Sequence, residues 1–422
     1  MKKFRLSFYI GLSCLALLLA MAQFDSIQAS EKTEKIRVLI KSENPNKEKE
    51  LKAKHGVRHQ FGTKGFTTSV TPQQLTTLER LDHVEVSKVK TISIHNPDNG
   101  KASPKNGNRK STPSDQTPWG IEAIYNDESI SVTTGGEGVN VAVLDTGTYT
   151  SHPDLVNNVE QCKDFTKRSS ALTVGSCDDR NGHGTHVAGT VLGNGGTDGL
   201  GVYGVAPNAD LWAYKVLGNS GSGYADDIAY AIEHAADQGN QLNENVVISM
   251  SLGSSSESPL ITDAVNYAVN QGALVVAAAG NSGPDAGTIG YPGATPNAIA
   301  VAALENSRNN GEYGVDSYSS RGLYGGAGDF SIEEGDVEVS APGTAIESTW
   351  NNGGYNTISG TSMATPHISG LAAKMWATNP SLSNTQLRAN LQSNAKENDI
   401  TLGSSAGVGD DIASGFGFPL VQ

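Results

Sequence analysis

Four apolar runs alternate with helix-like segments between residues 140 and 279, and this alternation limits the folds open to the chain. Each run is short and almost wholly apolar, as expected of a strand buried on both faces. The segments between them, A-D-D-I-A-Y-A-I-E-H-A-A and P-L-I-T-D-A-V-N-Y-A-V, have helical spacing, each followed by a Gly. We therefore predict an α/β domain, a parallel sheet with helices on both faces. The runs are N-V-A-V-L, A-D-L-W-A-Y-K-V-L, N-V-V-I-S-M-S-L and A-L-V-V-A-A-A.

The N-terminal part of the chain differs from the rest in charge. Residues 1–111 hold 20 Lys and Arg against 10 Asp and Glu, whereas residues 112–422 hold 10 against 34. Opposite net charges suggest two parts that attract each other. The acidic part argues against nucleic acid as a partner, because basic patches bind nucleic acid.

Residues 1–29 are expected to be a secretory signal peptide. A basic start is followed by an apolar run that is short for a membrane span, and small residues at Ala22 and Ala29 offer cleavage sites. After its removal we expect a soluble, secreted, extracellular protein with no membrane association.

A small α+β unit is predicted next, with two strand-like runs and a helix opened by Thr71 and Pro72. Residues 96–117 are rich in Pro, Gly, Asn and Ser, which indicates an exposed linker open to cleavage. We therefore divide the chain into the signal peptide (1–29), an N-terminal segment (30–111) and a large domain (112–422).

Two of the three cysteines, Cys162 and Cys177, lie outside the signal region. In an exported protein an even pair favours a disulfide, which contributes about 3 kcal/mol in the loop-entropy description. Two free thiols are the alternative.

Polar residues follow two of the predicted strands. Asp145 ends the first run, in V-L-D-T-G, and Asn281 follows the last, in A-A-A-G-N-S-G. Parallel sheets bind ligands beyond the carboxyl ends of their strands, so both are candidate site residues. D-T-G also occurs in aspartic proteases, but these need two carboxyl groups that share a proton. The chain has one D-T-G and no D-S-G, which disfavours that interpretation.

A metallohydrolase is a second interpretation of the same Asp. The motif N-G-H-G-T-H-V-A-G places His183 and His186 three residues apart, with Asp145 as a possible third ligand. Two His and a carboxylate can bind Zn²⁺. The zinc helix motif, however, has its His residues four apart with a Glu between them, and that pattern is absent here.

A nucleophilic Ser is the third interpretation. The segment S-G-T-S-M-A-T-P-H (359–367) opens an Ala-rich helix. A hydroxyl at a helix N-terminus is exposed beside backbone N–H groups that face developing negative charge. From the residues alone, Ser359 and Ser362 both qualify.

The three motifs V-L-D-T-G, N-G-H-G-T-H-V-A-G and G-T-S-M-A-T-P-H, in the order Asp, His, Ser, together resemble the subtilisin family of secreted serine endopeptidases. The resemblance is greatest to the bacillary subtilisins that include cold-adapted members. It extends from about residue 118 to the C-terminus and includes S-M-S-L-G and A-A-A-G-N-S-G. More weakly, the N-terminal segment resembles the family's inhibitory prosegment in size, charge and position.

This resemblance implies a role for each candidate catalytic residue. Ser362 would attack the peptide carbonyl, and His183 would take its proton and later give it to the leaving amine. Asp145 would hold the imidazole in the correct tautomer. The side chain of Asn281 and the backbone N–H of Ser362 would form the oxyanion hole. His186 is implied to be structural.

The resemblance also implies how substrate binds. An extended substrate strand would lie beside Ser251, Leu252 and Gly253, main chain to main chain. Gly280 and Gly290 would line the first specificity pocket, where the missing side chain of Gly290 leaves room for a large apolar or aromatic group. We therefore expect broad specificity, with such groups preferred before the cut.

Ca²⁺ is implied by the family and by the acidic charge. Asp154, in S-H-P-D-L, matches a family ligand, and Asp198 would add an oxygen from a loop longer than usual in the family. Asp336 and Glu338 resemble a second, weaker cation site near Gly293, with the two acidic types exchanged.

A self-processing precursor is the last expectation. We expect the prosegment, residues 30–111, to inhibit its own catalytic domain and the linker to be cut near residues 108–113. Protein and peptide substrates are the other expected partners, and the mature enzyme is expected to be a monomer. A catalytically silent peptide-binding relative and the metallohydrolase are the alternatives.

Overall fold

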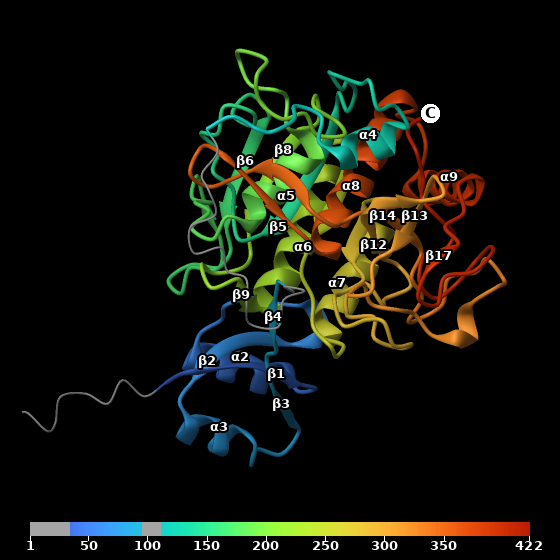
Figure 1. The fold of residues 1–422 in the computed structure, drawn as a ribbon. Coiled ribbons are helices and arrows are strands. Elements are labelled where there is room, and N and C mark those ends of the chain that lie inside the picture. The colour runs from blue at the N-terminus through green and yellow to red at the C-terminus, as the bar shows by residue number, and fades with distance from the viewer. Residues whose placement is uncertain (1–33, 95–110) are drawn as a thin grey trace, which may run out of the picture. The chain divides into compact units, whose positions relative to one another are not determined.

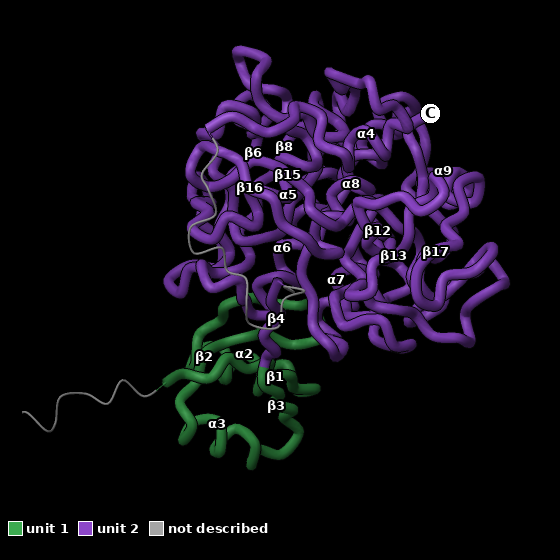
Figure 2. The backbone as a smooth tube through the Cα atoms, viewed as in Figure 1, with its two compact units in different colours: residues 1–88 green, residues 89–422 purple. Residues whose placement is uncertain are grey.

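The computed structural model describes residues 34–94 and 111–422, which belong to two compact units, residues 1–88 and 89–422 (Figure 2). The predicted signal peptide and most of the predicted linker lie outside the described residues. The second unit begins at Val89, earlier in the chain than the boundary that we placed after residue 111.

The first unit is an antiparallel sheet with strand order β2-β1-β3 and two helices (Figure 1). Its core contains Val38, Ile40 and Phe66. The helix predicted after Thr71 is present, and Thr71 and Gln74 form a capping box that satisfies two N-terminal backbone groups. The elements are β1 (Ile36–Ser42), α2 (Pro45–His55), η1 (Gly62–Lys64), β2 (Phe66–Val70), α3 (Pro72–Leu78) and β3 (Val84–Lys88).

The second unit contains a mostly parallel ten-stranded sheet, with strand order β17-β13-β12-β11-β10-β5-β8-β6-β7 and with β14 beside β12. The predicted runs form β5, β8, β10 and β11, which confirms the parallel α/β prediction. The strands are β4 (Thr91–Ser93), β5 (Val139–Asp145), β6 (Val159–Asp164), β7 (Thr173–Val174), β8 (Asp210–Lys215), β9 (Ser222–Tyr224), β10 (Asn245–Met250), β11 (Leu274–Ala278), β12 (Ile299–Asn309), β13 (Glu312–Val315), β14 (Val339–Pro342), β15 (Ile346–Thr349), β16 (Tyr355–Ile358) and β17 (Leu402–Gly403).

Helices cover both faces of this sheet (Figure 1). Helices α5 and α8 pack on each other over one face, and α6 and α7 pack on each other over the other face. Strand β5, in the middle of the sheet, is buried along its whole length, which explains its uninterrupted apolar sequence. The helices are α4 (Trp119–Tyr125), α5 (His183–Leu192), α6 (Ala225–Leu242), α7 (Pro259–Asn270), η2 (Tyr324–Gly326), α8 (Thr361–Thr378) and α9 (Asn384–Glu397).

Strands β5, β10 and β11 are parallel, so their carboxyl ends meet at one edge of the sheet. Asp145 is the last residue of β5, Ser251 follows β10, and Asn281 lies three residues beyond β11. The topology therefore brings together residues that are far apart in the sequence.

Within residues 34–94 and 111–422, no helix combines the length and apolar character that crossing a bilayer requires.

Candidate active site

Asp145 and His183 form a buried pair at the carboxyl edge of the sheet. The Nδ1 atom of His183 lies 2.9 Å from Oδ1 and 3.0 Å from Oδ2 of Asp145. The backbone N–H of Thr146 donates to the same Oδ1 at 2.6 Å. A buried carboxylate requires such donors, and it in turn favours the tautomer that carries its proton on Nδ1.

The charge on Asp145 also changes the acidity of the ring. Burial lowers the pKa of His183, but the charge and hydrogen bond of Asp145, together with the charge of Asp179, outweigh it and leave the pKa above its ordinary value. The ring is therefore a somewhat stronger base than a free imidazole.

Asp179 organises the start of α5, a role that our sequence reasoning missed. Its Oδ1 accepts from the backbone N–H groups of Asn181 and Gly182, both at 2.9 Å. Its Oδ2 accepts from the N–H of Thr185 at 3.0 Å and from its hydroxyl at 2.6 Å. Gly182 is the N-cap of α5 and Thr185 lies in its first turn, where a helix leaves N–H groups without intrahelical partners. Asp179 therefore stabilises the turn that carries His183. An Asp four residues before the helix was the available signal.

Close approach of α5 to the end of β5 depends on Gly184. A Cβ atom at this position would lie 2.1 Å from the carbonyl oxygen of Gly147 and 3.0 Å from the Cβ of Asp145. Only a residue without a side chain allows this separation. The Gly of the H-G-T-H motif is therefore required for packing, whereas the first His of the motif contacts Asp145.

His186 has a different environment from His183. Its Nε2 lies 2.9 Å from the carbonyl oxygen of Ile346, and burial lowers its pKa to about 3. The ring is neutral and attaches α5 to β15. Because the two His rings contact different partners, they do not form the metal pair that the second interpretation requires.

Ser362 is the second residue of α8, and only 2% of it is exposed. Its hydroxyl donates to the carbonyl oxygen of Ser251 at 3.3 Å, and the hydroxyl of Ser251 donates to the carbonyl oxygen of Ser362 at 2.7 Å. Ser359 instead precedes the helix and accepts from the N–H of Ala345 at 2.9 Å. Ser359 therefore has a structural partner, whereas Ser362 lies at the helix N-terminus.

Thr361 orients the Asn281 side chain, and our sequence reasoning missed it as well. The Oδ1 atom of Asn281 accepts from the N–H of Thr361 at 3.0 Å and from its hydroxyl at 2.9 Å. The hydroxyl oxygen of Thr361 also accepts from the N–H of Gly280 at 3.2 Å. With its oxygen held on α8, the amide directs its Nδ2 donors away from Thr361.

The three chain segments that carry the predicted pocket residues lie together. The N–H of Gly290 donates to the carbonyl of Ala279 at 2.8 Å, and Ser254 and Tyr291 exchange two backbone hydrogen bonds, both at 2.9 Å. The predicted pocket residues Ser251, Leu252, Gly253, Gly280 and Gly290 belong to these segments. A Cβ at Gly290 would lie 3.1 Å from the carbonyl oxygen of Ser254, so Gly keeps this space open.

Strand β4 pairs with β9 on one edge and forms an isolated bridge with Gly253 on the other. It is antiparallel to β9, and Ile92 lies opposite Gly223. On its other edge, the N–H of Ser93 donates to the carbonyl of Gly253 at 3.2 Å, and the N–H of Gly253 donates back at 2.9 Å. β4 thus lies as an extended strand against the segment predicted to bind substrate.

A disulfide joins Cys162 and Cys177, as we predicted. Cys162 is in β6, and the carbonyl of Cys177 accepts from the N–H of Thr148 at 2.9 Å. The bridge restrains the segment that leads to Asp179.

Asp154 and Asp198, the predicted cation ligands, face a common space. A Cβ at Gly196 would lie 2.9 Å from Oδ1 of Asp154 and 3.5 Å from Oδ1 of Asp198. Burial raises the pKa of Asp154, and the charge of Asp198 raises it further. The charge of His152 and the hydrogen bonds from Val202 and Tyr355 oppose this shift. A buried carboxylate with another acid nearby is an environment that a cation would stabilise.

Glu338, predicted as a ligand of the second cation site, has other partners. Arg388 donates to it from Nε at 2.8 Å and from Nη2 at 2.5 Å, and Gln392 donates at 2.8 Å. A bidentate Arg pair neutralises the carboxylate, so Glu338 is part of a buried ion pair. Asp336 accepts from the N–H of Glu333 at 2.7 Å. The second cation site stays a prediction.

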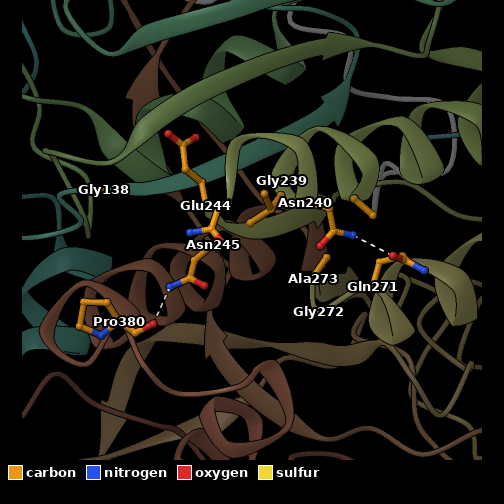
Figure 3. A pocket seen from close by; sticks show the side chains of 12 residues that line it. Gly138, Gly239, Asn240, Glu244, Asn245, Gln271, Gly272, Ala273 and Pro380 are labelled. Carbon is orange, nitrogen blue, oxygen red and sulfur yellow. Dashed lines mark hydrogen bonds between the residues drawn. The ribbon is translucent and has the colours of Figure 1, made fainter.

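A separate pocket of about 460 Å³ lies at the opposite edge of the sheet (Figure 3). Gly138, Asn245 and Ala273, which line it, stand at the amino ends of β5, β10 and β11. It contains none of the candidate catalytic residues and is distinct from the site described above.

A buried Asp–His pair and a Ser at a helix N-terminus are features of hydrolases with a nucleophilic Ser. Comparison with known proteins gives the family. The profile of the subtilase family matches residues 136–412. A subtilisin from Bacillus sp. strain TA39 is 58% identical over 93% of each chain, and an alkaline protease from Alkalihalobacillus alcalophilus is 41% identical over 72% of this chain and 70% of its own.

Solved structures agree with this assignment. Sphericase has a TM-score of 0.73 and 67% identity, covering 74% of this chain and all of its own. The S41 psychrophilic protease has a TM-score of 0.72 and 65% identity with the same coverage. The chain belongs to the subtilase family and is a subtilisin-like serine endopeptidase.

The first prediction tests the role of Thr361. Thr361→Val removes the hydroxyl that holds the side chain of Asn281. We expect kcat to fall about 5- to 10-fold while KM stays nearly constant, because one hydrogen bond that positions a transition-state donor is lost. Thr361→Ser keeps the hydroxyl and should stay within about twofold of wild type. Steady-state kinetics on a peptide anilide measures both; a change confined to KM would contradict the assignment.

The second prediction concerns pH. Because the pKa of His183 is raised, its ring stays protonated to a higher pH than a free imidazole, and a protonated ring cannot accept the Ser proton. As pH falls, kcat/KM should therefore decline with a midpoint above about 6.5, the ordinary value for His. Asp145→Asn should move the midpoint down and exposed Asp285→Asn should not. A wild-type midpoint below 6.5 would be inconsistent with this account.

Proposed function

We propose that this endopeptidase cuts protein substrates through Asp145, His183 and Ser362. The buried hydrogen bond between His183 and Asp145 is the observation that carries the proposal. It would leave Nε2 of the ring as the proton acceptor for the hydroxyl of Ser362, the second residue of α8. A hydroxyl is a weak nucleophile at neutral pH and requires such a base.

In the first step the Ser362 hydroxyl turns from the carbonyl of Ser251 towards His183. Oγ bonds to the scissile carbonyl carbon while its proton passes to Nε2. The imidazolium, stabilised by Asp145, then gives this proton to the leaving amine as the C–N bond breaks. Water enters by the same route, and its attack releases the acid product and restores the hydroxyl.

Negative charge on the carbonyl oxygen is stabilised by the Nδ2 donors of Asn281 and by the backbone N–H of Ser362. Both belong to rigid elements, because Thr361 holds the amide and α8 holds the N–H. Donors positioned in advance need no reorganisation during the reaction, which is the source of their effect. Subtilisin is itself the established example of this effect: loss of its Asn donor costs about 10²- to 10³-fold in kcat, and we adopt that magnitude for Asn281.

Substrate specificity is proposed to be broad, with large apolar or aromatic groups preferred before the cut. Gly280 and Gly290 present no side chain to the proposed pocket, and the predicted subsite residues carry no charge. The binding mode is an extended strand against Ser251, Leu252 and Gly253, and the pairing of β4 with Gly253 supports it.

Ca²⁺ is proposed at Asp154 and Asp198. Their oxygens face the space beside Gly196, and backbone carbonyls of the loop 193–204 would complete the oxygen-rich set that Ca²⁺ prefers. The cation would neutralise buried Asp154 beside the exposed Asp198 and hold this loop. It lies outside the reaction itself.

Export and self-processing complete the proposal. The signal-like residues 1–29 would direct secretion, and residues 30–111, with a net charge of +8, would inhibit the acidic catalytic domain until removed. Charge attraction should mainly speed their association, and salt should slow it. The mature enzyme is proposed to act as a monomer.

The third prediction identifies the nucleophile. Ser362→Ala should reduce kcat by several orders of magnitude with the fold retained, because the base and oxyanion hole act through this hydroxyl. Ser359→Ala should be mild. Casein hydrolysis and circular dichroism of both variants provide the test, and reversed effects would show that Ser359 is the nucleophile.

The fourth prediction concerns Ca²⁺. Chelation should lower the unfolding temperature by several degrees and speed self-digestion, because a cation bound only to the folded state stabilises it by mass action. Asp198→Asn should reduce this shift, and exposed Asp285→Asn should leave it unchanged. Scanning calorimetry with and without chelator measures the shift. Abrupt, reversible loss of activity on chelation without unfolding would instead indicate a catalytic metal.

A further inference from the structure

The hairpin formed by β15 and β16 lies against α5, the helix that begins with His183 (Figure 2). The hydroxyl of Ser348 donates to the carbonyl of His186 at 2.9 Å, and the hydroxyl of Thr349 donates to the carbonyl of Thr185 at 2.7 Å. Both hydroxyl residues are buried. Strand β15 therefore holds the helix just after His183.

The tip of the same hairpin contacts the chain just before His183. Gly182 is the N-cap of α5 and has a φ angle of 111°, which glycine adopts without strain. A Cβ atom at Gly182 would lie 2.3 Å from Cζ2 and 2.4 Å from Cε2 of Trp350, so the indole occupies the space that a side chain would need. Next to it, Nδ2 of Asn351 donates to the carbonyl of Asp179 at 3.2 Å. The hairpin thus contacts the chain on both sides of His183.

Trp350 is itself held in place at the start of the hairpin turn. Its N–H donates to the carbonyl of Gly354 at 2.7 Å, and its carbonyl accepts from the N–H of Gly353 at 3.1 Å. The indole also meets the ring of His186 edge to face, with the ring centroids 6.2 Å apart. These contacts fix the indole over Gly182.

The other end of the hairpin leads to the proposed nucleophile. Strand β16 ends at Ile358, and Ser362 follows four residues later as the second residue of α8. Between them, the N–H of Gly360 donates to the carbonyl of Gly343 at 2.9 Å and closes the base of the hairpin. One short segment therefore contacts the start of α5 at its tip and continues into the start of α8 at its end.

We propose that Trp350 is a positioning residue for the reaction. The inference rests on the proposed catalytic roles of His183 and Ser362. A glycine next to the base has backbone freedom that would let the imidazole move, and the indole restrains Gly182. Proton transfer depends on orientation, and a displacement of about 1 Å can cost about 100-fold in rate. Trp350 acts through His183 rather than through contact with substrate.

Steady-state kinetics of the mature enzyme tests this role. Trp350→Ala should lower kcat about tenfold while KM stays within about twofold, because orientation is lost in the transition state and not in substrate binding. Trp350→Phe keeps an aromatic ring against Gly182, and its kcat should stay within about threefold of wild type. The rates are expressed per active site, counted with a serine-directed inhibitor, at a temperature well below unfolding. A loss confined to KM, or an unchanged kcat in Trp350→Ala, would overturn the inference.

Trp376→Phe is the matched control for lost packing. Trp376 is 1% exposed and lies on α8, fourteen residues after Ser362, far along a helix that rises about 1.5 Å per residue. Its substitution should lower the unfolding temperature and leave kcat unchanged. If kcat fell in proportion to the unfolding temperature in the variants of both Trp residues, Trp350 would have a purely structural role and the inference would be wrong.

A double-mutant cycle tests the contact itself. Gly182→Ala places a methyl group where the indole lies and should lower kcat at least about tenfold. In the Trp350→Ala background the same change should cost at least about threefold less, because the ring is gone while the backbone strain is the same. Equal losses in the two backgrounds would contradict the proposed contact. Asn351→Ala, which should lower kcat about two- to threefold with KM unchanged, keeps the inference testable if Trp350→Ala fails to fold.

His183→Ala separates this inference from the proposal on which it rests. Activity retained by His183→Ala would refute the proposed catalytic roles, and the inference with them. Loss of activity in His183→Ala, together with a wild-type kcat in Trp350→Ala, would refute only the role of Trp350.

Discussion

The site depends on the hydrogen bond between Asp145 and His183, which is buried at the end of β5. A buried carboxylate is costly unless donors satisfy it, and here the ring and the N–H of Thr146 do so. The same contact determines which ring nitrogen is available as a base. Most of the surrounding structure serves to hold these two side chains together.

Three features bring the pair into contact. The parallel sheet places Asp145 at the edge where other strands end, Gly184 allows α5 to approach that edge, and Asp179 satisfies the first turn of the helix. The disulfide between Cys162 and Cys177 restrains the segment before Asp179. The geometry of this pair is thus supported by backbone packing and helix capping as well as by the two side chains themselves.

The sequence predicted the parts whose signal is local. Buried strands have uninterrupted apolar runs, and the motifs around Asp145, His183 and Ser362 stand at strand and helix ends. Thr361 was missed because its role appears only when α8 meets Asn281 from another part of the chain.

Long-range partners explain the other differences. Glu338 resembles a cation ligand in the sequence, but Arg388, fifty residues later, neutralises it. The pairing of Glu338 with Arg388 leaves no mark in the neighbouring sequence.

The tautomer of His183 tests the central claim most directly. Nitrogen-15 NMR of mature enzyme, with the His183 signals assigned by comparison with His183→Gln, reports which ring nitrogen carries the proton. Above the pKa of the ring, the account predicts a protonated Nδ1 and an unprotonated Nε2, with this preference lost in Asp145→Asn. A proton on Nε2 in the wild-type enzyme would contradict it, because the ring could then not accept the proton of Ser362.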